Sequence, residues 1–155
     1  CELRLDNKKN HKKVVLASGV FDLLHLGHIK YLEAAKKKGG KYAKLIVIVA
    51  RDQTVEKIKG RKPIIPEKQR CALINSLKVV DTAILGYEKL DIDEIIAKIK
   101  PDVIALGYDQ KIIEKSIQNY INNNDSNIKV IRIGKLGKNI LGSSSNILRK
   151  IIKNN

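Results

Sequence analysis

The sequence predicts a single-domain α/β fold with a doubly wound parallel sheet. Short apolar segments alternate with segments of helical periodicity along the chain, and this order gives a parallel sheet joined by right-handed crossovers. The apolar segment LIVIVA is continuous rather than alternating, which is typical of a strand covered on both faces. The length of 155 residues fits one domain, and no repeat or low-complexity linker divides it.

Five short apolar runs are the expected strands. VVLASGV comes first, LIVIVA and VIAL are the most continuously apolar, and the last run alternates apolar and polar side chains. The expected strands cover residues 14–20, 45–50, 83–85, 103–106 and 128–133. Ligands of such folds lie beyond the carboxyl ends of the strands. Residues that directly follow a strand are therefore the first candidates for a functional site.

Helical periodicity and prolines define the segments between the strands. Ile29, Leu32 and Ala35 share one face of the first helix, and lysines followed by a Gly-Gly pair mark its end. Pro66 precedes the second helix, and Pro101 ends the third. The expected helices cover residues 25–38, 67–77, 92–99, 112–123 and 143–153, and residues 51–66 are expected to form a helical turn followed by a loop.

The charge of the chain predicts that it attracts anions. Lys and Arg number 31 against 16 Asp and Glu, which gives a formal net charge of +15. Nucleic acid, acidic lipid headgroups and small phosphorylated molecules are the candidate partners. Aromatic residues make up only 4% of the chain, which leaves few stacking platforms for nucleic acid. We therefore favour an ordinary lysine-rich surface, and a basic nucleic-acid- or nucleotide-binding module is the non-enzyme alternative.

No feature of the sequence predicts a membrane or a secreted protein. No apolar run reaches the roughly 20 residues of a membrane-spanning helix. The N-terminal segment CELRLDNKKNHKK lacks the apolar stretch of a secretory signal, and two cysteines are too few for a disulfide scaffold. We expect a cytoplasmic protein in which residues 1–13 form a basic N-terminal arm and residues 14–155 form one domain.

Two histidines stand where the first strand becomes a helix. His25 and His28 are three residues apart, with Gly27 between them. A helix N-terminus offers free N–H groups to phosphate, and two imidazoles there can donate to a triphosphate and to the charge that builds on its α-phosphate. A zinc pair or two helix-capping histidines are the alternatives, but helical zinc pairs are usually four residues apart and need a third ligand. His11 is the only other histidine, so no metal-binding residue is predicted.

The string GVFDLLHLGH around these histidines resembles the His-x-Gly-His signature of the nucleotidyltransferase superfamily of adenylyl- and cytidylyltransferases. The resemblance implies a Rossmann-like fold with a nucleotide-binding turn. The residues that it places at the nucleotide are Gly19, Val20, Phe21, His25, Leu26, Gly27 and His28. We expect Asp22 to pack or to orient a histidine. The middle string IVIVARDQTVEKIKGRKPIIPEKQR is most similar to archaeal FAD synthases and less similar to glycerol-3-phosphate cytidylyltransferases.

A second segment, KPIIPEKQR, resembles the phosphate-contacting loop of the same family. Lys62 and Arg70 occupy the positions of the family's loop lysine and helix arginine. The resemblance implies that both are catalytic residues on the side opposite the histidines, where a Lys and an Arg can clamp a polyphosphate. The alternative for Lys62 is an ordinary surface lysine.

Two further segments match the family in order. GYDQ, after the strand VIAL, resembles the family's Gly-x-Asp segment and implies that Asp109 binds the nucleotide, although spacing alone equally favours a helix cap. GSSSNI resembles the motif that opens the family's last helix. It implies that Ser143, Ser144 and Ser145 hold the β- and γ-phosphates, with a plain N-cap as the alternative.

The resemblance implies a nucleotidyl transfer in which AMP passes from ATP to FMN and yields FAD and pyrophosphate. A phosphate oxygen of the acceptor attacks the α-phosphorus in line, so the protein's task is to position charges. A divalent metal cation, Mg²⁺, is expected to bridge the phosphates. The alternative enzyme is a cytidylyltransferase that uses CTP and glycerol 3-phosphate or another phosphorylated alcohol or sugar. Dimers are usual in the family, so a homodimer is expected.

Overall fold

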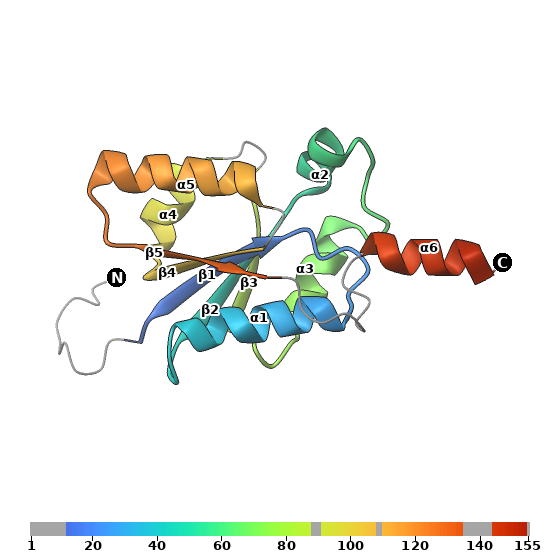
Figure 1. Cartoon of the computed structure of the whole chain (residues 1–155), viewed down its shortest axis with the longest axis horizontal. Coiled ribbons are helices and arrows are strands. Elements are labelled where there is room, and N and C mark those ends of the chain that lie inside the picture. Colours follow the sequence, from blue (N-terminus) through green and yellow to red (C-terminus); the bar gives the residue numbers. More distant parts are fainter. Residues whose placement is uncertain (1–11, 88–90, 108–109, 135–143, 155) are drawn as a thin grey trace.

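The computed structural model of the chain contains one parallel β-sheet (Figure 1). It describes residues 12–87, 91–107, 110–134 and 144–154. Within these residues the sheet has five strands in the order β3-β2-β1-β4-β5, and all neighbours are parallel. The strands are β1 (Val14–Gly19), β2 (Lys44–Val49), β3 (Thr82–Leu85), β4 (Val103–Gly107) and β5 (Lys129–Ile133). The predicted single-domain, doubly wound α/β fold is confirmed.

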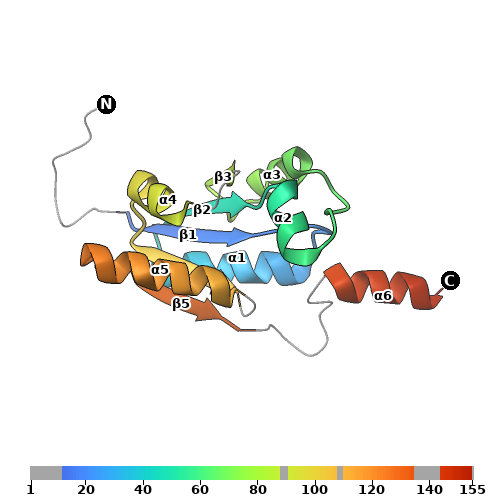
Figure 2. The ribbon, with the colours of Figure 1, turned by 90° about the horizontal axis from the view of Figure 1, so that it is seen from above.

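Helices cover both faces of this sheet. The helices of the described residues are α1 (Leu26–Lys38), α2 (Asp52–Lys59), α3 (Glu67–Asn75), α4 (Ile92–Ile99), α5 (Lys111–Asn124) and α6 (Ser144–Asn154). Figure 1 shows α1 and α3 on one face and α4 and α5 on the other. Figures 1 and 2 both place α6 beyond the carboxyl ends of the strands, outside the two helical layers.

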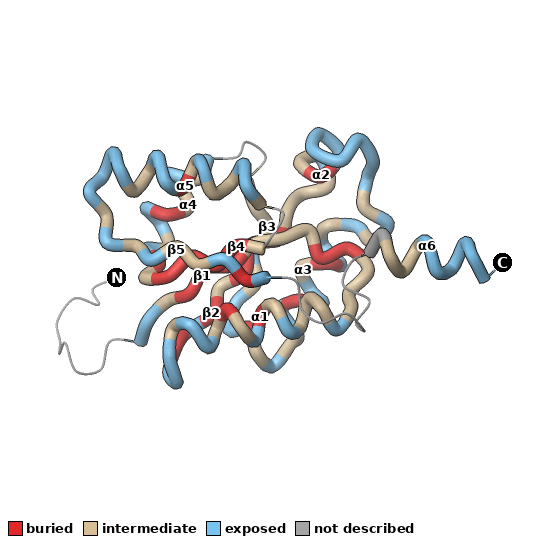
Figure 3. The backbone as a smooth tube through the Cα atoms, viewed as in Figure 1, coloured by how far each residue is buried: buried red, intermediate tan, exposed pale blue. Residues whose placement is uncertain are grey.

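Side chains that alternate along the strands build a core on each face. In β1, Val15 and Ala17 belong to the cluster under α1 and α3, whereas Leu16 belongs to the cluster under α4 and α5. Leu32 of α1 is one of the buried helical residues of the first cluster, and Ile117 of α5 is one of those of the second. Figure 3 shows buried residues concentrated in the central strands. Cover on both faces explains why these strands have continuous apolar sequences.

The predicted strands and helices are present within two residues of their expected ends, and one helix is longer than expected. Residues 51–66 contain the complete helix α2, where the sequence predicts a single helical turn, so two helices connect β2 to β3. Gly60 ends α2 in a left-handed conformation (φ 72°) that glycine adopts without strain. The prediction of one turn is wrong because Val55 and Ile58 are the only apolar residues of α2, too few to show a helical period.

The sheet changes its winding direction at β1, which has β2 on one side and β4 on the other. Ligands of doubly wound sheets bind in the crevice at this point. Two side chains join the carboxyl ends of β1 and β4. Gln110 Nε2 donates to Ser18 O (3.1 Å), and Gln110 Oε1 accepts from Gly107 N (2.9 Å). Tyr31 Oη donates to Ala105 O (3.0 Å). These hydrogen bonds fix the carboxyl ends of β1 and β4 relative to each other.

The structure bears differently on the expectations about membrane-spanning segments and about the N-terminal arm. No helix of the described residues is long and apolar enough to cross a membrane. The basic arm falls outside the described residues except for Lys12 and Lys13, which are exposed. The division into an arm over residues 1–13 and a domain over residues 14–155 therefore stays a prediction.

Candidate active site

The turn between β1 and α1 has a strained backbone that the core holds in place. Phe21 has a φ of 51°, a left-handed conformation that is rare for bulky residues and costs about 1–3 kcal/mol. Its side chain is 4% exposed and belongs to the cluster under α1. A Cβ atom at Gly19 would lie 2.8 Å from the Phe21 ring. Gly19 therefore makes room for Phe21, and packing fixes the turn.

His25 and His28 stack on each other at the start of α1. Their ring centroids are 3.8 Å apart, with an interplanar angle of 21°, and the Phe21 ring meets His28 edge-on at 5.4 Å. His25 is the N-cap of α1, and its backbone N–H donates to His28 Nδ1 (3.2 Å). Because Nδ1 accepts a hydrogen bond, the neutral His28 ring carries its proton on Nε2.

The ring of His25 has unsatisfied polar atoms. Nδ1 and Nε2 are both buried and have no hydrogen-bond partner among the described residues. An unpaired buried polar atom costs about 1–3 kcal/mol, and most buried polar atoms of folded proteins have a partner. A phosphate oxygen that accepts a hydrogen bond from the His25 ring would remove this cost.

Both histidines are neutral at pH 7. Burial, followed by His25 and the positive charge of Lys59, lowers the pKa of His28 to about 4 against the opposing effect of Asp22. Burial also lowers the pKa of His25. A neutral imidazole offers one N–H donor and no positive charge, so the positive charge near the turn comes from other side chains such as Lys59.

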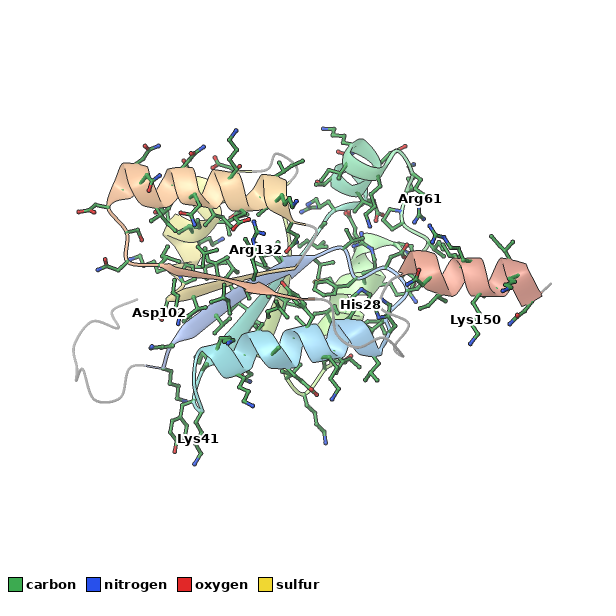
Figure 4. All side chains as sticks on the ribbon, in the orientation of Figure 1. His28, Lys41, Arg61, Asp102, Arg132 and Lys150 are labelled. Carbon is green, nitrogen blue, oxygen red and sulfur yellow. The ribbon has the colours of Figure 1, made fainter. Side chains whose placement is uncertain are left out.

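Positive side chains surround a small cavity beside this turn. The cavity is lined by Val20, Asp22, Val55, Lys59, Arg61, Lys62 and Pro63. Lys59, Arg61 and Lys62 are exposed, and Lys59 lies close enough to His28 to lower its pKa. Figure 4 shows Arg61 and His28 at the same end of the molecule. Three cations thus line a hollow that Val20 and Asp22 of the β1–α1 turn also line, and cations of this kind can bind phosphate.

Arg70 is buried inside the protein rather than directed at a ligand. It is 0% exposed. Its Nη2 donates to Asp52 Oδ1 (2.6 Å), its Nη1 to Val20 O (2.6 Å) and its Nε to Ile65 O (2.8 Å). Every nitrogen of the guanidinium already has a protein acceptor. This arrangement does not match the direct phosphate contact that the sequence predicts for Arg70.

Residues 16–151 match the model of the cytidylyltransferase-like family. The chain belongs to this family. A curated FAD synthase of Thermoplasma volcanium is 48% identical over 139 residues, which are 90% of this chain and 94% of the relative. A curated FAD synthase of Methanothermus fervidus is 49% identical over 136 residues, or 88% and 92% of the two chains.

The fold of a solved structure agrees with this family membership. The crystal structure of the lipopolysaccharide core biosynthesis protein from Thermoplasma volcanium GSS1 superposes with a TM-score of 0.70. The two sequences are 49% identical, and the match covers 79% of this chain and 97% of that chain. Family and relatives together identify this member of the cytidylyltransferase-like family as a nucleotidyltransferase.

The β1–α1 turn of this nucleotidyltransferase contains most of the predicted site residues. They are Gly19, Val20, Phe21, His25, Leu26, Gly27 and His28. Lys62 lies on the neighbouring loop. Asp109 and Ser143 lie outside the described residues, and Ser144 and Ser145 open α6 with side chains that are not described. Contacts between any of these residues and a nucleotide stay predictions.

Two residues have roles at the site that the sequence did not indicate. Lys59 is the last residue of α2 and lies near His28, and a complete α2 was not expected. The Asp22 carboxylate accepts hydrogen bonds from the backbone of Ile64 and Ile65, whereas the sequence led us to expect that Asp22 packs or orients a histidine. Asp22 lies 42 and 43 positions from these two residues, too far for a local sequence pattern to link them.

Proposed function

We propose that this chain is an FAD synthase, which transfers AMP from ATP to FMN and releases pyrophosphate. The observation that carries the proposal is the stacked, neutral pair of His25 and His28 at the N-terminus of α1, beside a cavity with three cations. This arrangement supplies hydrogen-bond donors and charge for a triphosphate. The curated FAD synthases that resemble this chain over about nine-tenths of its length support FMN as the acceptor.

In the proposed reaction a phosphate oxygen of FMN attacks the α-phosphorus of ATP. The new P–O bond forms opposite the bond to the β-phosphate bridging oxygen, and this second bond breaks with its electron pair leaving on pyrophosphate. The acceptor phosphate is already ionised at neutral pH, so the reaction needs no general base. The Nε2–H of His28, oriented by the hydrogen bond from His25 N to Nδ1, donates to the α-phosphate oxygens as they gain charge.

The cations and the imidazoles stabilise different parts of the substrate. The two neutral rings donate to the α-phosphate, while Lys59 and Lys62 neutralise the departing β- and γ-phosphates. In the same proposal Asp109 accepts from the base or ribose, and serines 143–145 donate to the β/γ end of the nucleotide at the start of α6.

The proposed metal ion enters with the nucleotide. The described residues contain no group of three or more His, Cys, Asp or Glu side chains that could hold a metal ion, so they do not fit a resident metal centre. Mg²⁺ often uses few protein ligands and binds substrate phosphates. We therefore propose MgATP as the nucleotide substrate, with the cation held by phosphate oxygens.

A homodimer and a cytoplasmic location complete the proposal. The homodimer follows from the resemblance to the family, in which dimers are usual, and the cytoplasmic location is the expectation from the sequence. Analytical ultracentrifugation of the purified protein tests the first: a species of twice the chain mass of 17.4 kDa is expected, and a monomer at all concentrations would contradict it.

A substrate screen tests the proposed activity. The purified protein is incubated with Mg²⁺ and each combination of ATP or CTP with FMN or glycerol 3-phosphate, and both FAD and pyrophosphate are measured. We expect equal amounts of FAD and pyrophosphate from ATP with FMN. Pyrophosphate release only from CTP with glycerol 3-phosphate would reject the proposal.

Substitution of His28 tests the role of the imidazole pair. His28→Asn should lower kcat about 100- to 1000-fold, because one preorganised donor is removed from the transition state. His11→Asn, which changes the histidine outside the β1–α1 turn, is the matched control and should leave kcat unchanged. Near-normal kcat in His28→Asn would contradict the assigned role.

A further inference from the structure

We propose that Asp22 and Arg70 are positioning residues that hold the loop between α2 and α3 against the histidine turn, and that they act on catalysis through Lys62. The inference rests on the proposed function because it takes Lys62 as a phosphate contact. Residues 60–66 form this loop, and it carries both Arg61 and Lys62.

Asp22 fixes the loop through two successive peptide groups. Its Oδ2 accepts from Ile64 N (3.0 Å), and its Oδ1 accepts from Ile65 N (2.9 Å). The residue is 6% exposed, so water competes little for these hydrogen bonds. A carboxylate that receives two adjacent N–H groups sets both the position and the rotation of the loop backbone.

Arg70 ties the same loop to two further elements. It holds Ile65 through the carbonyl oxygen, directly beside the N–H that Asp22 accepts. Its other two nitrogens reach Val20, at the end of β1, and Asp52, at the start of α2. The fully buried guanidinium therefore joins the loop, the histidine turn and α2 at one point.

Asp52 is itself held in place by the start of α3. Asp52 Oδ2 accepts from Glu67 N (3.3 Å), and Glu67 Oε2 accepts from Asp52 N (2.7 Å). Arg51 pairs with the second oxygen of Glu67 (3.3 Å). Each of the two carboxylates thus accepts from the backbone N–H of the other residue, which links the starts of α2 and α3. These bonds hold Asp52 in place as the acceptor for Arg70.

These contacts restrict where Lys62 can go. The loop leaves α2 at Gly60 and is fixed again at Ile64, so only three residues lie between the two attachments. Lys62 is the middle one. A catalytic cation that is held near its working position avoids the loss of rate that a misplacement of about 1 Å can cause, up to roughly 100-fold.

A double-mutant cycle tests whether Asp22 acts through Lys62. Asp22→Asn keeps the size of the side chain but turns an NH₂ group toward one backbone N–H donor. We expect kcat/KM for ATP to fall up to about 100-fold in Asp22→Asn. The double variant with Lys62→Ala should lose no more than the worse single variant. Losses that multiply would overturn the proposal.

Asp81→Asn is the matched control. Asp81 also accepts a backbone hydrogen bond, from Leu45 N (2.7 Å), but at the amino end of the sheet. The variant should lose stability and keep the kcat/KM of the wild type. Should Asp22→Asn fail to fold, Arg70→Lys takes its place, because a lysine cannot reach the three acceptors of the guanidinium at once.

Limited trypsin digestion tests the positioning without any activity assay. The bonds after Lys59 and Arg61 lie in or next to the loop. Below the unfolding temperature, Asp22→Asn should be cut there at least several-fold faster than the wild type and Asp81→Asn, as read by mass spectrometry. Equal cleavage rates would overturn the proposal. A wild type that makes no FAD would reject the proposed function, and the digestion would still decide the role of Asp22.

Discussion

Acidification is expected to destabilise the folded protein through His28. Burial lowers the pKa of the folded ring to about 4, from an ordinary value of 6.5. Between these two values the unfolded chain binds a proton at this position and the folded chain does not, so stability falls as the pH falls. The contribution of the neutral ring is complete above pH 6.5 and is lost progressively as the pH decreases toward 4.

The two pKa values set the size of the effect. Linkage gives a loss of about 2.5 kcal/mol in the free energy of unfolding between pH 7.5 and pH 4.5. The geometry gives the same direction, because a proton on His28 Nδ1 would face the N–H donor of His25. The loss is a large share of the ~5–15 kcal/mol by which domains are usually stable.

Urea unfolding of the wild type and of His28→Asn at both pH values measures this loss. The other titrating groups are common to the two proteins, so the difference between them isolates His28. The stability advantage of the wild type should shrink by about 2.5 kcal/mol at the lower pH, and an NMR titration should give His28 a midpoint near pH 4. A difference that stays constant within about 0.5 kcal/mol, with a midpoint near 6.5, would refute the reasoning.

Three further substitutions test separate parts of the site. Gly19→Ala should destabilise the protein by about 1–3 kcal/mol in thermal unfolding and should lower kcat, because its Cβ would push the Phe21 ring that supports His28. Gly60→Ala should cost about 1 kcal/mol, since φ is 72° and no described atom lies near the added Cβ; unchanged stability would contradict the left-handed cap. Lys59→Ala should raise the pKa of His28, seen as a higher NMR midpoint, because it removes a neighbouring positive charge.

The fold could be predicted because its signals are local. A strand covered on both faces has an uninterrupted apolar sequence, as in β2 and β4, and prolines and glycines mark the ends of several helices. The histidine turn could be predicted for the same reason, since Gly19 and His28 are only nine positions apart. α2 lacked this signal because most of its side chains are polar and face solvent.

The role of Arg70 could not be predicted because its partners come from distant parts of the sequence. Val20 lies 50 positions away and Asp52 lies 18 positions away. The sequence shows an arginine at the start of a helix, next to a loop that resembles the family's phosphate-contacting loop. This pattern fits a ligand contact and a buried structural residue equally well. The three-dimensional arrangement of acceptors around the guanidinium distinguishes them.

The left-handed Phe21 has a consequence for the proposed binding of a nucleotide at this turn. The buried ring anchors this turn in the core, which leaves the turn little freedom to change shape. Its peptide N–H groups and imidazoles are then already ordered before a ligand binds. Such preorganisation lowers the entropy cost of binding and favours affinity. In the proposed function, the fixed turn therefore loses little of its own conformational entropy when it binds the triphosphate.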